Sequence, residues 1–480
     1  MVAGGVSRII SGSKYPEHNS IDTDTSPTAA GAAVHCAAML IAAPASGHGK
    51  TSITAALARL HRRNGLRVRC FKTGPDFIDP TMLVQASGHP VYNLDTWMMG
   101  VEHCRALLFE AAQSCDLILV EGAMGLFDGE PSSADLAQQF GLPILPVINA
   151  SSMAQTFGAL LHGLMTYRPG LEFVGAVANR VASARHEQML RMSVPADMPL
   201  SIVMRSEAVT LPERHLGLQI ADEIGDLDER IDALADLLQQ TPLAQLPAAV
   251  TFTPPQRMID VELSVDGADA TPLLADITIA VAFDAAFCFL YQANLEWLQR
   301  LGARLHIFSP LDDDELPPVD AIYLPGGYPE LHAAQLAANE VLLDAIRAHI
   351  NAGKPVLAEC GGMMYLTDKL IDLEGRTHDM LGALPGAVTM AKRLCAIGPQ
   401  QLDVAGFKAL RGHTFHYSSL ATTLAPTWSA ATPNERPGEA VYCSDSMVAS
   451  YVHWYFPSNP QLIAHWLLGA DRLDSAADRD

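Results

Sequence analysis

The stretch AAMLIAAPASGHGKTS, residues 37–52, decides the fold of the first half of this 480-residue chain. Its apolar start predicts a buried strand, and the segment after it, 51–63, has apolar residues at helical spacing. A strand, a glycine-rich turn and a helix in this order are typical of a phosphate-binding loop. Pro44 stands where the usual pattern has its first glycine, but the strand–loop–helix context is retained.

The loop supplies groups that suit a nucleotide phosphate. Gly47 and Gly49 allow the backbone to fold closely around phosphate oxygens, and Lys50 would neutralise the β and γ oxygens. The Thr51 hydroxyl would bind Mg²⁺, and the following helix presents its positive end to the phosphates. The residues predicted to bind ATP are Gly47, His48, Gly49, Lys50, Thr51 and Ser52.

Apolar strands alternate with helical segments from this loop to about residue 240, which predicts an α/β domain with a doubly wound, mostly parallel sheet covered by helices on both faces. After the run 37–43, the predicted strands are 67–71, 116–120, 144–148 and 174–178, and the helical segments include 51–63, 153–165 and 225–239.

A carboxylate follows one of these strands at the position where a phosphate-loop enzyme holds its metal. Glu121 comes directly after the strand 116–120 and before a glycine-rich turn. Ligands bind at the carboxyl ends of strands in open α/β sheets, so we predict that Glu121 holds Mg²⁺ or its water together with Thr51.

Two further acidic residues are predicted at the same edge of the sheet. Asp76 follows the strand 67–71, next to Phe77 and Ile78, and Asp128 follows the turn after Glu121. These residues are candidates for the ATP site or for orienting a substrate, and their spacing does not separate the two roles. Asp76 has a third reading as a residue that stabilises only its own turn.

A proline-containing stretch, 241–275, predicts a linker, after which a second alternating α/β block begins. Its predicted strands are 277–283, 304–308, 321–324 and 355–358, its helices lie near 291–301 and 337–351, and short β segments follow residue 385. The expected domains are a disordered extension 1–35, an ATP-dependent domain 36–240, the linker 241–275, a second α/β domain 276–470 and a tail 471–480.

The second block carries a candidate nucleophile. Cys360 follows the strand 355–358 at a sharp strand-to-helix turn with small neighbours, and the helix N-terminus is expected to favour its thiolate. Backbone N–H groups of Gly326, Gly327 and Gly361 are candidates for an oxyanion hole. A cysteine nucleophile needs a base, and His416 and His453 are the candidates.

Composition restricts the class of protein. The formal net charge of −22 argues against nucleic acid or an anionic membrane surface as a partner. Eight cysteines without a Cys-x-x-Cys pair disfavour a zinc ribbon and a disulfide scaffold, and they fit the reducing cytoplasm. The sequence has no apolar run of membrane-spanning length and no pattern typical of a signal peptide, so we expect a cytoplasmic protein.

Over residues 37–470, the motifs resemble, in order, those of the cobyrinate a,c-diamide synthase family of corrinoid biosynthesis, which includes the hydrogenobyrinate a,c-diamide synthases. The motifs that carry the resemblance are Ser46–Thr51, Phe71–Pro80, Asn93–Met98, Val120–Gly129, Leu211–Leu218, Leu324–Glu330, Ala358–Gly362, Gly412–Ser418 and Ser450–Phe456.

The resemblance implies an ATP-dependent domain similar to dethiobiotin synthetase, joined to a class I-type glutamine amidotransferase domain. It implies that Cys360 hydrolyses L-glutamine through a thioester with His453 as base. ATP and Mg²⁺ would then activate the a and c acetate carboxylates of cobyrinic or hydrogenobyrinic acid as acyl phosphates, which ammonia converts to amides. Ammonia must escape protonation, so a shielded path between the domains is expected.

The resemblance assigns the site residues by position. Gly47, Gly49, Lys50 and Thr51 would bind ATP, Glu121 would lie at the metal, and Asp76 and Asp128 would lie at the ATP or substrate site. The assembly is not readable from the sequence, and a homodimer is left open.

Three positions depart from relatives. Tyr455 stands where ordinary class I amidotransferases have a glutamate two residues after the histidine, so the group that orients His453 is not identified. Thr414 stands where relatives often have Glu, and Asn149 where many have Asp.

Two kinds of alternative function remain: the same amidation on another macrocycle, or a different class of protein. The same machinery could act on hydrogenobyrinate or on nickel sirohydrochlorin, and cobyric acid synthase is disfavoured by the segments 71–80 and 211–218. A different class is a P-loop switch ATPase that carries a non-catalytic amidotransferase-like module.

Overall fold

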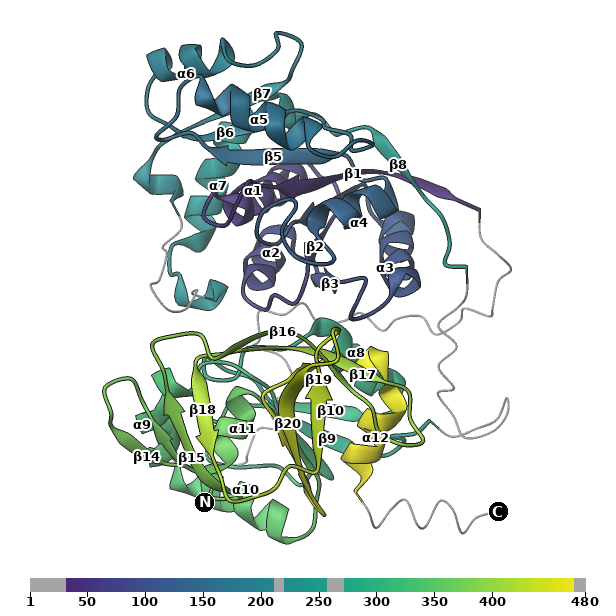
Figure 1. Cartoon of the computed structure of the whole chain (residues 1–480), viewed down its shortest axis with the longest axis vertical. Helices are drawn as coiled ribbons and strands as arrows, with labels where there is room; N and C mark the ends of the chain where they lie inside the picture. Colours follow the sequence, from purple (N-terminus) through teal and green to yellow (C-terminus); the bar gives the residue numbers. More distant parts are fainter. Residues whose placement is uncertain (1–31, 211–219, 257–271, 470–480) are drawn as a thin grey trace, which may run out of the picture. The chain divides into compact units, whose positions relative to one another are not determined.

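The computed structural model describes residues 32–210, 220–256 and 272–469, and it divides the chain into two compact α/β units (Figure 1). The first unit takes its described residues from Met1–Leu94 and Glu102–Arg257, and the second from Asp95–Val101 and Met258–Asp480. The predicted tail 471–480 and residues 1–31 of the predicted extension lie outside the described residues. The predicted fold class, α/β with a mostly parallel N-terminal sheet, is confirmed.

The sheet of the first unit has the strand order β3-β2-β4-β1-β5-β6-β7, and all these neighbours pair in parallel. An additional strand, β8, pairs antiparallel with β1 and lies inside the stretch predicted as a linker, so this unit reaches beyond residue 240. The strands are β1 (Val34–Ala42), β2 (Val68–Thr73), β3 (Tyr92–Leu94), β4 (Leu117–Glu121), β5 (Ile144–Asn149), β6 (Ala176–Val181), β7 (Leu200–Met204) and β8 (Ala249–Phe252).

Helices pack on this sheet through its alternating side chains. Met39 and Ile41 of β1 lie in one buried cluster with Ile53 and Leu57 of the helix that follows the phosphate loop. The α-helices of this unit are α1 (Lys50–Arg63), α2 (Asp79–Ser87), α3 (Val101–Ser114), α4 (Ser133–Phe140), α5 (Thr156–Thr166), α6 (Ala184–Arg191) and α7 (Leu227–Leu238). Its 3-10 turns are η1 (Glu207–Val209), η2 (Ala221–Glu223) and η3 (Pro242–Ala244).

A sheet with the order β10-β9-β11-β12-β21-β20-β19-β16-β17-β22 runs through the second unit. Its first five strands pair in parallel and the rest in antiparallel fashion, and the strands past residue 385 agree with the short β segments predicted there. These strands are β9 (Thr278–Ala282), β10 (Arg304–Phe308), β11 (Ala321–Leu324), β12 (Val356–Glu359), β16 (Ala396–Leu402), β17 (Leu410–His416), β19 (Trp428–Ala431), β20 (Pro437–Ser444), β21 (Met447–Ser450) and β22 (His453–Trp454).

A smaller sheet of this unit has the order β14-β13-β15-β18. Its strands are β13 (Thr367–Ile371), β14 (Thr377–Asp379), β15 (Leu384–Met390) and β18 (Ser418–Ala421). The helices of the unit are α8 (Gln292–Arg300), α9 (Ala333–Ala338), α10 (Glu340–Asn351), α11 (Gly361–Leu366) and α12 (Pro460–Leu468), with 3-10 turns η4 (Pro329–Leu331) and η5 (Phe456–Ser458). In the part of the chain that the structure describes, no helix has the length and apolar character needed to cross a membrane.

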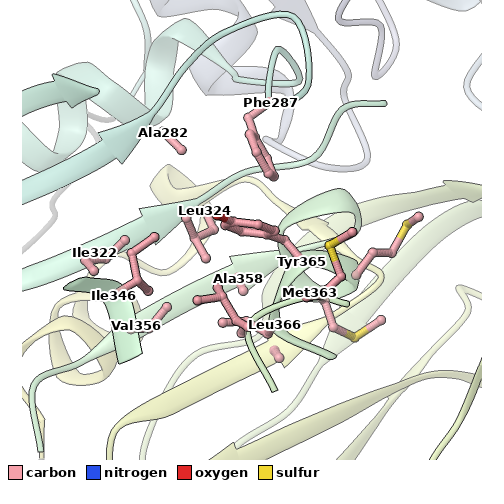
Figure 2. Packing of buried hydrophobic residues seen from close by; sticks show 14 of the residues in the cluster. Ala282, Phe287, Ile322, Leu324, Ile346, Val356, Ala358, Met363, Tyr365 and Leu366 are labelled. Atoms are coloured by element: carbon pink, nitrogen blue, oxygen red, sulfur yellow. The ribbon is translucent and has the colours of Figure 1, made fainter. Parts of the chain in front are cut away.

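Successive side chains of β11 and β12 point to opposite faces of the sheet, so the core of the second unit has two layers. Ile322, Leu324, Val356 and Ala358 join the cluster that also holds residues of α10 and α11, and Figure 2 shows this packing. Tyr323 and the other alternate positions join a second cluster with residues of α8 and α12. A strand buried on both faces has polar side chains mainly at its ends, which is where both candidate sites lie.

One short segment of the second unit interrupts the first in sequence. The segment Asp95–Val101 lies between β3 and α3 but belongs to the second unit. Arg411 of β17 holds it, since its Nη1 donates a hydrogen bond of 2.7 Å to the Trp97 carbonyl and its guanidinium lies 5.1 Å from the centre of the Trp97 ring.

Truncating Ile346 to alanine should destabilise the second unit, because its side chain on α10 is fully buried. We expect Ile346→Ala to lower the free energy of unfolding by about 2–5 kcal/mol. The matched control on the same helix is Val341→Ala, since Val341 is 63% exposed. Urea unfolding followed by tryptophan fluorescence reports on this unit, because all five tryptophans belong to it. Equal losses in both variants would contradict the core assignment.

Candidate active sites

The phosphate loop joins β1 to α1 and requires glycine at two positions. Gly47 and Gly49 have φ angles of 78° and 93°, in the left-handed region that favours glycine. A Cβ at Gly49 would lie 2.3 Å from Nδ2 of Asn179, so a larger residue does not fit. Asn179, at the end of β6, donates a hydrogen bond of 3.0 Å to the His48 carbonyl and thereby fixes the loop.

Lys50 points into the loop. Its Nζ donates to the Met124 carbonyl at 2.7 Å and to the Ala45 carbonyl at 3.4 Å. Burial, and then the nearby charge of Lys72, lowers the pKa of Lys50. A phosphate anion bound in the loop would offset both effects, since an opposite charge favours the ammonium form.

His48, Asn149 and Ser52 surround the loop. The Asn149 N–H at the end of β5 donates 2.9 Å to His48 Nδ1, which therefore acts as an acceptor. Burial and the charge of Lys50 lower the pKa of His48, in agreement with a neutral ring. Ser52 is half-buried in the first turn of α1. Asn149 thus contacts the loop through its backbone.

Glu121 and Thr51 form a pair suited to a magnesium ion. The Thr51 hydroxyl donates a 2.7 Å hydrogen bond to Glu121 Oε1. Glu121 is fully buried at the end of β4, and its Oε2 has no hydrogen-bond partner among the described residues. Mg²⁺ takes hydroxyl and carboxylate oxygens and completes its shell with phosphate oxygens and water, so these two side chains fit it. In the described part of the chain, no group of three or more His, Cys, Asp or Glu residues is arranged to hold a metal.

Lys72 joins the acidic residues of this edge, and sequence reasoning did not select it. Its Nζ lies 2.5 Å from Asp79 Oδ2, 2.9 Å from Glu121 Oε1 and 3.5 Å from Asp76 Oδ2. Lys72 is 2% exposed at the end of β2. A signal was present in the sequence, because Lys72 stands near the carboxyl end of a buried strand. A buried lysine needs an acidic partner, so this position could have indicated a charged site.

The charges of this cluster are set by burial and by Lys72. Burial alone would lower the pKa of Lys72, but Asp79 and Glu121 hold it well above its ordinary value. Burial raises the pKa of Glu121 to about 7, and burial together with Asp79 raises that of Asp76 to about 6. The cluster therefore holds more carboxylate than one buried lysine neutralises, which suits a site that receives a cation.

Asp76 combines two of the roles considered for it. Its Oδ1 accepts hydrogen bonds from the N–H groups of Ile78 (2.9 Å) and Asp79 (3.1 Å), so it does stabilise its own turn. Its other oxygen faces Lys72. Ile78 is buried and Phe77 is half-buried in the same turn.

Asp128 lies on the loop after β4 and is exposed. Its Oδ2 accepts a 2.9 Å hydrogen bond from the Gly125 N–H. A Cβ at Gly125 would lie 2.5 Å from both Asp128 Oδ2 and the Pro44 carbonyl, which places Asp128 beside the start of the phosphate loop. It has no described contact with the Lys72 cluster.

The second site is built on a strained turn. Cys360 lies between β12 and α11 with φ 45° and ψ −105°, a conformation that is rare for a residue with a side chain. Its N–H donates a 2.7 Å hydrogen bond to the carbonyl of Ser450 at the end of β21. The turn therefore has the geometry expected of a nucleophile elbow.

Gly326 lies close to both the candidate nucleophile and one candidate base. A Cβ at Gly326 would lie 2.1 Å from His453 Cε1 and 3.3 Å from Cys360 Cβ, so all three residues converge. A Cβ at Gly361 would lie 3.0 Å from the Gly327 nitrogen. The predicted oxyanion residues Gly326, Gly327 and Gly361 thus lie close to Cys360 and to one another, and of the two candidate bases His453 lies beside the same glycine as Cys360.

Burial disfavours the charged forms of both Cys360 and His453. Burial, and then Glu330, raises the pKa of the Cys360 thiol well above its ordinary value. Burial lowers the pKa of His453 to about 3. The Gly361 N–H at the start of α11 lowers the pKa of the thiol, as expected for a helix N-terminus, but the desolvation of the fully buried sulfur has the larger effect and disfavours the thiolate.

His416 belongs to a neighbouring network. Its Nε2 lies 2.9 Å from Glu439 Oε1, and its ring stacks on Tyr451 with centroids 3.8 Å apart. Thr414 donates a 3.0 Å hydrogen bond to the same Glu439 oxygen. A carboxylate is therefore present beside His416 although position 414 is threonine, and no local signal in the sequence indicates Glu439.

Comparison with known protein families identifies the two domains of the chain. Residues 39–218 match the CobQ/CobB/MinD/ParA nucleotide binding domain, and residues 278–461 match the CobB/CobQ-like glutamine amidotransferase domain. The chain is thus a nucleotide-binding domain fused to a glutamine amidotransferase domain.

Full-length relatives identify the family within this class. The chain is 55% identical to a hydrogenobyrinate a,c-diamide synthase of Stutzerimonas stutzeri, with 89% of this chain and 97% of that protein covered. It is 52% identical to one of Pseudomonas aeruginosa (92% and 99% covered) and 46% identical to a cobyrinate a,c-diamide synthase of Herminiimonas arsenicoxydans (89% and 95% covered). The chain belongs to the cobyrinate and hydrogenobyrinate a,c-diamide synthase family. Its motif at 211–218 lies outside the described residues.

Removing the Glu121 carboxyl should change how stability depends on pH. The folded protein holds protons on Glu121 (pKa about 7) and Asp76 (about 6) that the unfolded chain, at 4.5 and 3.8, releases. Stability without Mg²⁺ or nucleotide should therefore rise as the pH falls from about 8 to about 6. Thermal unfolding across this range should show a smaller rise in Glu121→Gln, while the exposed control Glu110→Gln should behave as the native chain does. Identical pH dependence in E121Q would contradict the assignment.

Cys360 should react slowly with iodoacetamide in the free protein. Burial hides its sulfur and raises its pKa, whereas Cys395 is exposed. Peptide mass spectrometry after timed alkylation should show Cys395 modified first, and the Cys360 rate should keep rising with pH above about 9. A Cys360 rate that levels off below about pH 8 would show that a thiolate exists at rest.

Proposed function

We propose that this protein catalyses the ATP- and glutamine-dependent amidation of the a and c acetate carboxylates of a corrinoid acid. The observation that carries the proposal is the convergence of Cys360, His453 and Gly326 in a chain whose other unit presents Lys50, Thr51 and Glu121 at one sheet edge. A glutaminase site and a phosphoryl-transfer site in one chain are what such a ligase requires.

Glutamine hydrolysis begins with a neutral thiol. As Cys360 Sγ attacks the side-chain amide carbon, His453 takes the thiol proton and passes it to the departing ammonia. The N–H groups of Gly327 and Gly361 stabilise the oxyanion of the tetrahedral intermediate. Water then hydrolyses the thioester and releases glutamate. The neutral pair suits this sequence, because the charges form only when substrate is present.

Activation of the corrinoid carboxylate requires charge neutralisation at the transferring phosphoryl group. Lys50 would leave its carbonyl partners to contact the phosphate oxygens, while Thr51 and Glu121 would hold Mg²⁺, which offsets the charge that develops on the β and γ phosphates. The acetate oxygen attacks the γ-phosphorus and ADP departs. Ammonia then displaces phosphate from the acyl phosphate to give the amide. Each amide uses one ATP and one glutamine.

Lys72 has a supporting role in this proposal. It keeps Asp76, Asp79 and Glu121 close together when no cation is bound. Asp76 and Asp128 remain candidates for contact with ATP or the corrinoid, and their positions next to Lys72 and next to Pro44 respectively are compatible with either ligand.

Hydrogenobyrinic acid is the macrocycle that we favour. The relatives at 55% and 52% identity are named for hydrogenobyrinate, and the one at 46% for cobyrinate. Cys36, Cys70, Cys115, Cys360, Cys395 and Cys443 are thiols and not disulfide-bonded, and we expect the protein to work in the reducing cytoplasm.

The proposal is tested by mass spectrometry after incubation of the purified protein with ATP, Mg²⁺ and glutamine, with hydrogenobyrinic and cobyrinic acid in parallel reactions. We expect two added amides, with hydrogenobyrinic acid consumed faster. Consumption of ATP without any amide on either acid would support an altered macrocycle or a switch ATPase instead.

Replacing the nucleophile should separate the two half-reactions. Cys360→Ala should lower glutamine-dependent amidation by about 10³-fold or more, because no thioester forms. Amidation with added ammonium chloride at high pH should remain unchanged, because the synthetase unit is intact. Cys395→Ala is the matched control and should retain both activities. Unchanged glutamine-dependent amidation in C360A would show that Cys360 is not the nucleophile.

A further inference from the structure

His453 belongs to a segment whose position must be fixed by a group other than the usual carboxylate. Position 455, where ordinary class I amidotransferases have a glutamate, is a tyrosine whose side chain is 1% exposed. A histidine base works only when it is held within reach of its nucleophile. The structure therefore has to supply another restraint on the strand β22.

Glu359 supplies a direct link between the two catalytic strands. It is the last residue of β12 and immediately precedes Cys360. Its Oε1 accepts a 3.0 Å hydrogen bond from the N–H of Trp454, the residue after His453. Its Oε2 accepts a 2.8 Å hydrogen bond from the Tyr323 hydroxyl.

Asn294 on α8 holds the same segment from the other side. Its Nδ2 donates 2.8 Å to the Trp454 carbonyl, and its Oδ1 accepts 2.9 Å from the Phe456 N–H. Glu359 and Asn294 are 1% and 0% exposed, so water does not compete for these bonds. Both backbone groups of Trp454 are therefore bound by buried side chains.

The position of Glu359 is anomalous for a carboxyl group. Alternation along β12 directs it into the apolar layer beneath α8 and α12, where Leu357 and Tyr323 lie. Burial there raises its pKa to about 8, which reflects the cost of charging it. An apolar residue at such a position is usually at least as stable, so the carboxyl is not explained by stability.

We propose that Glu359 is a positioning residue that sets the distance between Cys360 and His453 through the Trp454 backbone. The inference rests on the proposed glutaminase function. Glu359 and Cys360 are consecutive, as are His453 and Trp454, so one hydrogen bond ties the nucleophile elbow to the strand of the base. Both oxygens are engaged by Trp454 and Tyr323, so Glu359 acts through hydrogen bonding to the backbone and not through its charge on the imidazole.

Two substitutions at this position separate hydrogen bonding from charge. Gln in Glu359→Gln resembles a neutral carboxyl group, since its oxygen accepts from Trp454 and its amide donates to the Tyr323 oxygen. Leu in Glu359→Leu removes both acceptors and leaves the Trp454 N–H unpaired. Tyr323→Phe is the comparison variant, because it removes the hydroxyl from Oε2 and from Asn294 but leaves the hydrogen bond between Glu359 and the Trp454 N–H in place.

The measurements are glutamine hydrolysis over a range of pH, ammonia-dependent amidation and thermal unfolding of the full chain. We expect E359L to lose about 10²-fold in kcat for glutamine hydrolysis, because a misplacement of about 1 Å has that effect. Its KM for glutamine, its pH profile and its ammonia-dependent amidation should not change. E359Q should restore kcat, and Y323F should retain most of it.

Undiminished kcat in E359L would overturn the proposal, and so would E359Q as inactive as E359L, because charge would then be the cause. A shifted pH profile would also overturn it. If E359L does not fold, Glu359→Met removes both acceptors with an unbranched side chain of similar length, and native kcat in E359M would overturn the proposal. A native chain that hydrolyses no glutamine would refute the proposed function itself, whereas an active native chain with an inactive C360A leaves only the role of Glu359 in question.

Discussion

Parallel strands that are covered on both faces leave their carboxyl ends as the place for polar chemistry. In the first unit, β1, β2, β4, β5 and β6 all end at one edge, which brings the phosphate loop, Lys72, Glu121, Asn149 and Asn179 together. In the second unit, β11, β12 and β21 end beside Gly326, Cys360 and Ser450. The apolar strand interiors therefore determine where each site is, and the residues after the strands determine what it can do.

The two candidate sites differ in how burial affects their charged groups. At the nucleotide site, the buried carboxyl of Glu121 and the partly buried carboxyls of Asp76 and Asp79 lie around one buried ammonium, and burial leaves Glu121 with a pKa of about 7. This set of groups suits a further cation. At the cysteine site, burial raises the pKa of the thiol and lowers that of the imidazole, so both groups favour their neutral forms. A resting site of this kind is protected from oxidants, because a protonated thiol is a poor nucleophile.

Much of this could be predicted from the sequence, because the signals are local. The phosphate loop, Glu121 and the elbow at Cys360 each lie within a few residues of an apolar strand, and the structure places them as expected. Lys72 and Glu359 were missed because their partners are distant in sequence: Glu121 lies 49 residues from Lys72, and Trp454 lies 95 residues from Glu359. β8 was missed because proline-rich flanks made its four residues resemble a linker. The raised pKa of the thiol was not foreseen because the burial of Cys360 has no local signature in the sequence.

The segment Asp95–Val101, held by Arg411, has a consequence for how the chain matures on the ribosome. The first unit is nearly complete once residue 257 has been synthesised, yet this segment within it belongs to the second unit. Its partner on β17 is made more than 300 positions later, as the Trp97–Arg411 hydrogen bond shows. Arg411, which holds this segment in the folded protein, is therefore absent while most of the chain is being synthesised. For the same reason, no single break in the chain separates the two units, so they cannot be exchanged as interchangeable modules by joining the gene for one to that for the other.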